Sequence, residues 1–326
     1  MKSMYEERIK NMMENYEKLR SEFKWENDMA RHLIALSYAM KEKEPNITEI
    51  KKFKDYIKNR TGMFSPFRGH MTFILSGLLN ANTDNPKEEF KTMLNNEKIL
   101  KENGFKYSSY LPTALYSLSS VYKGDDVEGY AKKSMEIYKE MKRNHPFLTS
   151  GDDYALAILL ASTDHSTDLL ENYYTELNNR GFSKSNGLQM LSHIMAFSEN
   201  GVRESVNKCE NIHENLKANK LKIYADYYPA IGLISLIDGN QNELMNDLVE
   251  VADYLKKQKR YKWLGKGMNV LIASAIITSE YIKEKSEDTV VNTTLSVSIE
   301  TIITAQQAAM IAAITASTAA ATSAGN

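Results

Sequence analysis

The chain has 326 residues, a formal net charge of -1 at pH 7 and 25% charged side chains. This near-neutral balance creates no overall field for nucleic acid, so a dedicated nucleic-acid-binding protein is not expected. Only 6 prolines and 15 glycines favour helices over a turn-rich all-β fold. The single cysteine, Cys209, excludes an intrachain disulfide and is typical of a reducing cytoplasm, which is the expected location.

The first predicted helix covers about residues 4–23. Apolar side chains recur there at steps of three and four, which places them on one face of a helix. The acids and lysines between them face water, so residues 1–23 are expected to form an N-terminal capping helix for the elements that follow. The apolar positions are Tyr5, Ile9, Met12, Tyr16, Leu19 and Phe23.

A short apolar run then recurs along the chain. It begins near residues 32, 72, 113, 154, 190, 230 and 270, at spacings of about 36 to 41 residues, which is typical of a repeat architecture. These runs are apolar nearly all round and predict inner helices. Charged amphipathic stretches from Asn46 and near 87–103, 127–143, 167–179, 202–218 and 241–259 predict outer helices.

This alternation predicts an all-α fold. We expect a two-layer array of about six or seven antiparallel αα-hairpin repeats, forming either an open α-solenoid or a closed α/α toroid. All loops that lead from an inner to an outer helix would lie on one edge of such an array, and all loops that lead back would lie on the other. The loops into the outer helices are rich in acids, and the ends of the outer helices are rich in lysine and arginine, so one edge would be acidic and the other basic.

The last forty residues or so break the pattern. Residues 289–299 are β-branched and polar, and the composition then shifts to alanine, threonine and isoleucine. We expect residues 1–288 to form the helical-repeat domain and 289–326 to form a C-terminal segment, a docked helix with a frayed end. Threonines and glutamines interrupt it too often for a transmembrane span, which leaves weak membrane contact as the alternative.

The segments that lead into the predicted inner helices carry the candidate binding residues. Helix N-termini offer free N–H groups and a positive dipole end, so several that converge would attract a small anion. Ordinary helix-end chemistry predicts the same residue types, because proline, serine and aspartate suit helix starts and lysine suits helix ends. The candidate residues are Arg68, His70, Tyr110, Asp152, Asp153, Tyr227, Lys262 and Lys266.

The sequence contains no recognisable catalytic motif. Asp152 and Asp153 are the best candidate carboxylates, but neighbours on a helix point about 100° apart, and one of them is expected to cap the helix. The histidines never fall in a metal-binding spacing, so no metal site and no cofactor are predicted. Residues 254–263 interleave basic and aromatic side chains, as single-strand-binding or membrane-surface patches do, and as the end of an amphipathic helix also does.

Three short motifs stand out beside these patterns. They are Phe67-Arg68-Gly69-His70, then His145-Pro146-Phe147-Leu148-Thr149 followed by Gly151-Asp152-Asp153-Tyr154, and Trp263-Leu264-Gly265-Lys266-Gly267. Together they resemble a family of uncharacterised bacterial proteins of similar length, known as a domain of unknown function. The resemblance covers most of the chain and implies a bacterial source and one full-length domain. It implies no activity, substrate or site residue.

Three functional hypotheses follow from the sequence. The first is a cytoplasmic helical-repeat module that binds a protein or peptide through its inner surface and basic edge. The second is an α/α-toroid enzyme or small-molecule receptor with an anion-binding pocket at the N-termini of the inner helices. The third is a membrane-peripheral protein that uses its C-terminal segment.

Overall fold

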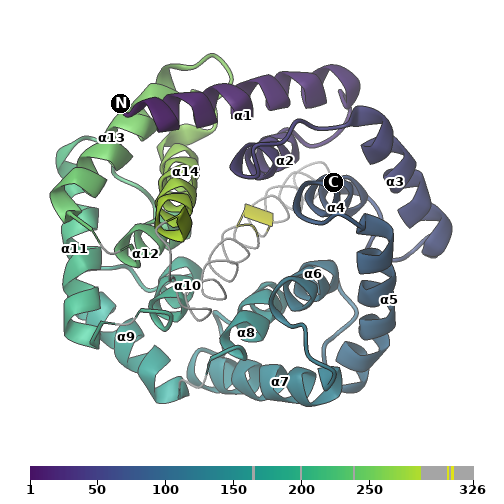
Figure 1. The fold of residues 1–326 in the computed structure, drawn as a ribbon. Helices are drawn as coiled ribbons and strands as arrows, with labels where there is room; N and C mark the ends of the chain where they lie inside the picture. The colour runs from purple at the N-terminus through teal and green to yellow at the C-terminus, as the bar shows by residue number, and fades with distance from the viewer. Residues whose placement is uncertain (164–165, 199, 238, 288–306, 308–309, 312–326) are drawn as a thin grey trace, which may run out of the picture. The chain divides into compact units, whose positions relative to one another are not determined.

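The computed structural model describes residues 1–163, 166–198, 200–237, 239–287, 307 and 310–311, with side chains described through residue 281 and at the last three positions. Within these ranges the regular structure consists of fourteen α-helices and two 3-10 helices, without a strand (Figure 1). The all-α prediction is therefore confirmed for the described part of the chain.

The contacts divide the chain into two compact units. Unit 1 comprises Met1–Tyr5, Ile137–Ser150 and Leu159–Gln306, and unit 2 comprises Glu6–Glu136, Gly151–Ile158 and Gln307–Asn326. The predicted division at residue 288 stays a prediction. Most of residues 289–326 lie outside the described residues, and the three that are described, Gln307, Met310 and Ile311, belong to unit 2.

Unit 2 contains most of α1 and α8, the first part of α7, and all of α2 to α6. The helices α2 and α4 pack together, and α3 and α5 pack against α4 and α6 on their outer side (Figure 1). The elements are α1 (Ser3–Glu22), α2 (Asp28–Met40), α3 (Ile47–Arg60), α4 (His70–Asn82), α5 (Pro86–Glu102), α6 (Leu111–Val121), α7 (Val127–Asn144), the 3-10 helix η1 (Gly151–Asp153) and α8 (Tyr154–Leu160).

Unit 1 contains the remaining helices. Its α10, α12 and α14 contact one another in that order, while α9, α11 and α13 pack against them. The elements are α9 (Thr167–Asn179), α10 (Asn186–Met195), α11 (Val202–Ala218), the 3-10 helix η2 (Ala225–Tyr227), α12 (Pro229–Ser235), α13 (Gln241–Lys257) and α14 (Gly265–Glu287).

Two kinds of helix alternate along the described chain. The even-numbered helices α2 to α14, which we call the inner helices, are buried at nearly every described side chain, whereas α3, α5, α9, α11 and α13 each bury a single stripe. This alternation matches the apolar and amphipathic stretches of the sequence. The arrangement of the pairs as repeats stays a prediction.

Local sequence explains where the amphipathic helices begin and which face they bury. The Asn46 side chain accepts a 3.2 Å hydrogen bond from the Glu49 backbone amide and so caps α3. Ile50, Phe53 and Ile57 follow on one face, each no more than 3% exposed. The predicted stripe of α1 is likewise buried from Tyr5 through Phe23.

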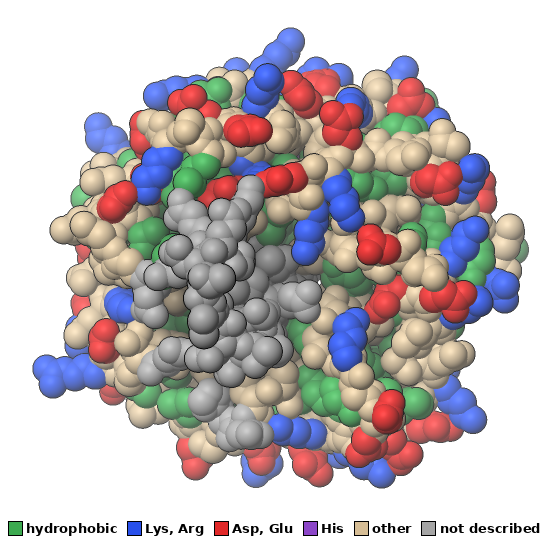
Figure 2. Space-filling view, in the orientation of Figure 1, with side chains coloured by type: hydrophobic (Ala, Val, Ile, Leu, Met, Phe, Trp, Pro, Cys, Tyr) green, Lys and Arg blue, Asp and Glu red, His purple; other side chains and the backbone are tan. Residues whose placement is uncertain are grey.

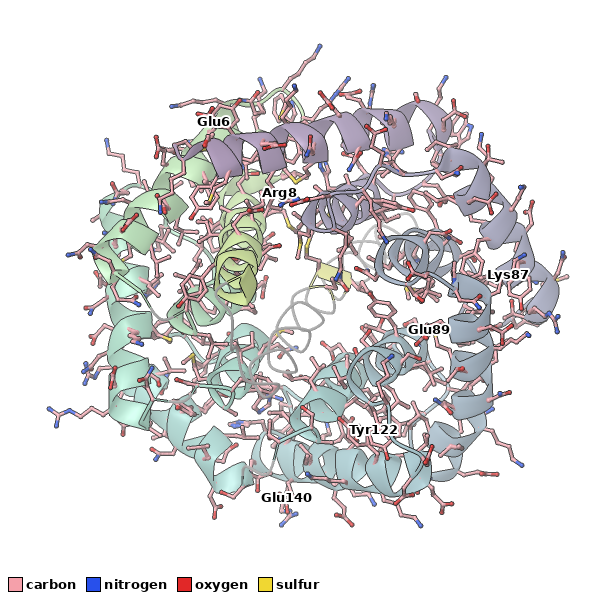
Figure 3. The ribbon with its side chains drawn as sticks, in the orientation of Figure 1. Glu6, Arg8, Lys87, Glu89, Tyr122 and Glu140 are labelled. Atoms are coloured by element: carbon pink, nitrogen blue, oxygen red, sulfur yellow. The ribbon has the colours of Figure 1, made fainter. Side chains whose placement is uncertain are left out.

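Buried arginines complete the ends of helices in unit 2. Arg8 of α1 points towards α2, where it donates to the Ala39 carbonyl and forms a 2.8 Å ion pair with Glu42, while Glu6 on the same helix points away (Figure 3). Free carbonyls at a helix C-terminus need donors, and a guanidinium can supply several. Arg8 is therefore part of the fold.

Candidate functional site

The predicted binding residues lie in or beside the loops that lead from an outer to an inner helix. We call these the outer-to-inner loops, and they comprise residues 23–27, 61–69 and 103–110 of unit 2 and residues 145–150, 180–185, 219–228 and 258–264 of unit 1. Arg68, His70, Tyr110, Asp152 and Asp153 belong to unit 2, whereas Tyr227, Lys262 and Lys266 belong to unit 1.

Arg68 completes the end of α3. Its Nη2 donates to the carbonyls of Lys58 and Thr61, and its Nε donates to the Gly62 carbonyl at 3.2 Å. These bonds hold the guanidinium against backbone oxygens, as a helix C-terminus requires. The helix-end interpretation of Arg68 thus has direct support, and anion binding by this residue stays a prediction.

The structure brings Tyr110, Asp152 and Asp153 together at the start of α8. Burial, and then the charges of Asp152 and Asp153, raise the pKa of the Tyr110 hydroxyl. Asp153 is only 7% exposed. A Cβ at Gly151 would lie 2.9 Å from the Tyr110 ring, so this glycine makes room for the tyrosine. The charges of these two carboxylates are therefore close enough to the phenol to act on its hydroxyl.

His70 begins α4 and is partly buried. Burial lowers the pKa of its imidazole, and the charge of Glu26 acts in the opposite direction. An imidazole that favours its neutral form adds little positive charge to this end of unit 2.

In unit 1 the starts of α10, α12 and α14 touch one another. A Cβ at Gly187 would lie 1.9 Å from the Ala225 carbonyl oxygen, and one at Gly267 would lie 2.1 Å from the Tyr227 ring. Tyr227 therefore packs against the first turn of α14, beside Lys266. The glycine at the end of the Trp263–Gly267 motif is needed for this close packing.

The outer-to-inner loops also hold a set of exposed apolar side chains, of which the sequence analysis singled out only Trp263, within residues 254–263, as part of a candidate binding patch. Among the described residues, eight large apolar side chains are exposed, and seven of them lie in these loops. Their position after the end of an amphipathic stretch and before the next apolar run is the signal that could have identified them. The seven are Trp25, Met63, Phe64 and Tyr107 in unit 2, and Phe147, Tyr224 and Trp263 in unit 1.

Charges are interspersed on the face of the molecule that Figure 2 shows, where lysines and arginines alternate with acids. One segment of the chain is instead strongly basic. Residues 256–266 hold five lysines and one arginine without an acid. Within them Lys262 Nζ lies 4.7 Å from the centroid of the Trp263 ring.

A polar network in unit 2 joins Gln307 to two inner helices. The Tyr116 hydroxyl of α6 donates to Gln307 Oε1 at 2.8 Å, and Gln307 Nε2 donates to the Ser37 hydroxyl of α2 at 3.3 Å. Asn82 at the end of α4 donates to the Tyr116 hydroxyl at 3.0 Å. Gln307, Met310 and Ile311 are helical and at most 4% exposed.

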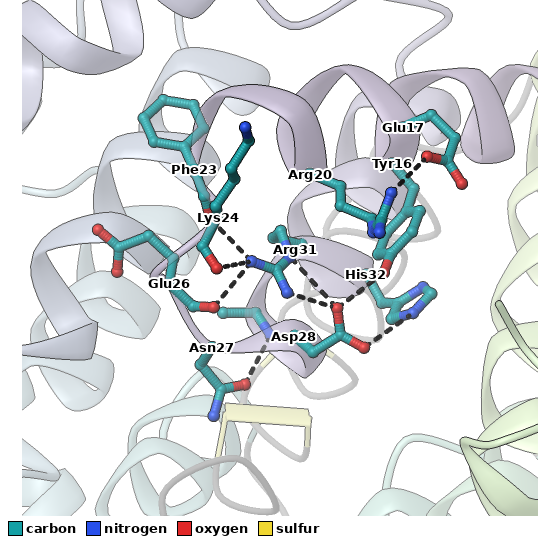
Figure 4. A network of polar contacts seen from close by, with 11 residues as sticks. Tyr16, Glu17, Arg20, Phe23, Lys24, Glu26, Asn27, Asp28, Arg31 and His32 are labelled. Carbon is teal, nitrogen blue, oxygen red and sulfur yellow. Dashed lines mark hydrogen bonds and ion pairs between the residues drawn. The ribbon is translucent and has the colours of Figure 1, made fainter.

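A second network in unit 2 is centred on Arg31 (Figure 4). Arg31 Nη1 donates to the carbonyls of Phe23, Lys24 and Glu26, while its Nε and Nη2 bind Asp28. His32 stacks on Tyr16 with a centroid distance of 4.0 Å, and burial lowers its pKa to about 4. The Arg31 guanidinium thus joins the residues of the turn between α1 and α2, which is a structural role.

The buried cysteine and histidine of unit 1 are also packed into the core. Cys209 lies 3.5 Å from both Met195 Sδ and the Ser235 hydroxyl, and burial raises its pKa to about 12. Burial and then the charge of His145 lower the pKa of His193 to about 3. A thiol that stays protonated is a poor nucleophile and a poor metal ligand.

No group of three or more histidine, cysteine, aspartate or glutamate side chains among the described residues is placed to hold a metal ion. None of the helices in this part of the chain combines the length and the apolar character that crossing a membrane requires.

Fold and site together define a class: an all-helical protein in which buried and amphipathic helices alternate and exposed aromatic residues occupy the loops before the buried ones. Residues 15–308 match the family described as "Protein of unknown function (DUF4003)", and the chain belongs to that family. The resemblance inferred from the three motifs is thereby confirmed.

The chain also resembles one protein of known source over nearly its whole length. Over 323 residues the chain is 29% identical to "Uncharacterized protein YeaA" of Bacillus subtilis (strain 168), and the match covers 96% of each chain. No solved structure matches the chain.

Proposed function

We propose that the chain is a helical-repeat binding module of the cytoplasm, in which the inner helices of unit 2 form a groove for a helical peptide. The observation that supports this most directly is the burial of Gln307, Met310 and Ile311 in unit 2. These positions follow the i, i+3, i+4 spacing by which one face of a helix enters a groove. The chain's own residues 307–311 would be the occupant in cis.

The groove has polar positions that select such an occupant. The Gln307 side-chain amide donates to Ser37 of α2 and accepts from Tyr116 of α6, so its nitrogen and its oxygen each bind a different helix. The buried hydroxyls of Thr113, Ser117 and Ser119 on α6 have no hydrogen-bond partner among the described residues. Buried hydroxyls normally find partners, so these three are available for groups on a bound peptide.

A peptide-binding measurement tests this proposal. We would titrate a labelled peptide with the sequence of residues 300–316 into the full chain carrying Met310→Glu and Ile311→Glu. Charged side chains at these buried positions should expel the chain's own segment from the groove. The expected result is saturable binding of the peptide by this variant and weaker binding by the unaltered chain, in which the groove is occupied.

The matched control carries Lys10→Glu and Lys98→Glu, which add the same residue type at side chains that are 73% and 82% exposed. It should behave as the unaltered chain does. Near-ultraviolet circular dichroism would report whether each variant keeps its tertiary packing. A well-packed Met310→Glu, Ile311→Glu variant that binds no peptide would refute the groove.

The anion-pocket alternative has less support. Arg68 donates to three backbone carbonyls, and the charges of Asp152 and Asp153 act on Tyr110. In unit 1, Lys262 and Lys266 remain exposed, but they accompany exposed aromatic side chains instead of lining a shielded site.

A further inference from the structure

We propose that the outer-to-inner loops dock the protein on an anionic lipid membrane, with their aromatic side chains in the headgroup region and their lysines on the lipid phosphates. Each unit contributes its own loops, and those of unit 2 do not include Ser37 and Tyr116, which contact Gln307. This loop surface differs from the C-terminal membrane contact considered from the sequence, because it uses loop residues on each unit.

Exposure of single large side chains is the first observation. Trp25 is 100% exposed, Phe64 91%, Phe147 98% and Trp263 81%. Both tryptophans of the chain are in this set. Leaving four such side chains in water is unfavourable in hydrophobic free energy, so a surface that covers them gains binding energy.

The position of these side chains is the second observation, because neighbouring outer-to-inner loops within each unit lie at one end of the helices. In unit 2 the Tyr107 hydroxyl donates to the Phe64 carbonyl at 3.4 Å, which joins loops 103–110 and 61–69. In unit 1, Ala225 contacts Gly187, and Tyr227 contacts Gly267, so loop 219–228 meets the starts of α10 and α14. In unit 2 the loops that carry Phe64 and Tyr107 are therefore neighbours, and in unit 1 the loop that carries Tyr224 lies beside the start of α14, which follows Trp263.

Charge is the third observation. The segment 256–266 surrounds Trp263 with six basic residues and no acid, and loop 219–228 holds Lys220 and Lys222 before Tyr224 and one acid, Asp226, after it. In unit 2, Lys101 Nζ lies 5.1 Å from the Tyr107 ring centroid, and Glu26, the acid of loop 23–27, is paired with Lys54. Each lysine or arginine close to an anionic leaflet adds to the electrostatic attraction between the protein and the membrane.

A membrane fits these features better than a protein partner does. Interface hot spots pack into pockets and are ringed by other residues, whereas Trp25, Phe64 and Phe147 are at least 91% exposed on loops. Tryptophan and tyrosine favour the boundary between apolar lipid and water, where the ring is buried and its polar group stays hydrated. An acidic protein partner is the competing outcome of the experiment.

The test uses the full chain with two vesicle preparations, one of phosphatidylcholine alone and one of phosphatidylcholine with an equal amount of phosphatidylglycerol. We expect sedimentation with the anionic vesicles only, weakened by salt as screened charges require. The intrinsic tryptophan fluorescence should shift to shorter wavelength. Trp263→Phe leaves Trp25 as the reporter for unit 2, and Trp25→Phe leaves Trp263 as the reporter for unit 1.

Paired truncations localise the contact. Trp25→Ala with Phe64→Ala, and Tyr224→Ala with Trp263→Ala, should each weaken vesicle binding by about tenfold or more. Tyr254→Ala is the matched control, because Tyr254 is the eighth exposed apolar side chain but lies on α13, outside the loops. Its removal should leave binding unchanged.

Three results would overturn the proposal: no binding to the anionic vesicles, binding that neither pair of substitutions weakens, or capture of poly-glutamate in place of vesicles. The second result would assign membrane contact to another surface, and the third would assign the loops to an acidic protein. None of these results alters the peptide titration that tests the groove, so the two proposals fail independently.

Discussion

The Tyr116 hydroxyl donates a 2.8 Å hydrogen bond to the side-chain oxygen of Gln307, a residue 191 positions further along the chain. The same amide reaches Ser37, 270 positions away. One glutamine thus connects α2 and α6 of unit 2 through side chains alone. The peptide-groove proposal begins from this contact.

Removing the Tyr116 hydroxyl should loosen unit 2 locally. Tyr116→Phe deletes the donor to Gln307 and the acceptor for Asn82, at an expected cost of about 1–2 kcal/mol in the free energy of unfolding. Hydrogen exchange should accelerate in α2 and α6. Gln307→Ala should cost a similar amount, and the double variant should cost less than the sum, since both remove one network. Strict additivity would contradict this coupling.

The close packing at the starts of α10 and α14 predicts a graded effect of added methyl groups. Gly267→Ala would push against the Tyr227 ring and should cost about 1–3 kcal/mol. Gly187→Ala meets the Ala225 backbone carbonyl, which cannot rotate away as a side chain does, so its cost should be larger. Thermal unfolding measures both.

Gly201→Ala is the control for these two, because nothing lies within 4 Å of its added Cβ. It should leave the melting temperature nearly unchanged. Tyr227→Leu should relieve part of the Gly267→Ala penalty by removing the ring. Equal losses at all three glycines would mean that packing between helix starts is unimportant.

The helices of this protein were predictable from local periodicity, whereas the tasks of the motif residues were not. The stripes of α1 and α3 follow from the helical repeat itself, and Asn46 follows from capping chemistry. Gly187 and Gly267 face residues about 40 positions away in sequence, and such packing leaves no local pattern. The bonds from Arg68 to the carbonyls of Lys58, Thr61 and Gly62 could not be predicted either, because backbone carbonyls leave no side-chain pattern in the sequence.

The exposure of the aromatic side chains in the outer-to-inner loops could not be predicted from the sequence either. Trp25 and Trp263 are next to lysines in the sequence, and an aromatic beside a lysine occurs both on buried stripes and in exposed loops. The length and bend of each loop decide which applies. In the structure both indole rings are exposed to solvent.

Arg31 should be among the most sensitive polar positions of unit 2. Arg31→Ala removes the guanidinium donor from three carbonyls after α1, of which Phe23 keeps the Glu26 amide, and deprives Asp28 of its ion-pair partner, so we expect a loss of about 3 kcal/mol. Arg20→Ala removes only an exposed pair with Glu17 and should cost under about 0.5 kcal/mol. Urea denaturation compares them, and similar losses would show that the buried network is not stabilising.

Cys209 should be chemically inert while the protein is folded. Burial raises its thiol pKa to about 12, so the reactive thiolate is scarce at neutral pH, and the side chain is inaccessible. A chromogenic disulfide reagent should react with it only at the rate at which unit 1 opens, and fully in denaturant. Rapid native-state labelling would show that the packing around Cys209 is looser than described.

His193 should make unit 1 sensitive to acid. Burial and the charge of His145 lower its folded pKa to about 3 from the ordinary 6.5, so between these values the unfolded chain binds the proton more readily than the folded one does. The contribution of neutral His193 to the free energy of unfolding is therefore fully present above about pH 6.5. It is lost as the pH falls towards 3, at up to about 1.4 kcal/mol per pH unit.

Replacing this histidine isolates its share from that of the carboxylates. His193→Gln removes the titrating ring, so the free energy of unfolding should fall less steeply between pH 6.5 and 4 than it does in the unaltered chain. His213→Gln serves as the control, because His213 is only partly buried and its pKa is lowered without reaching such an extreme. Unchanged slopes in the His193 variant would mean that the ring is hydrated on protonation, and that α10 opens to water without unfolding the unit.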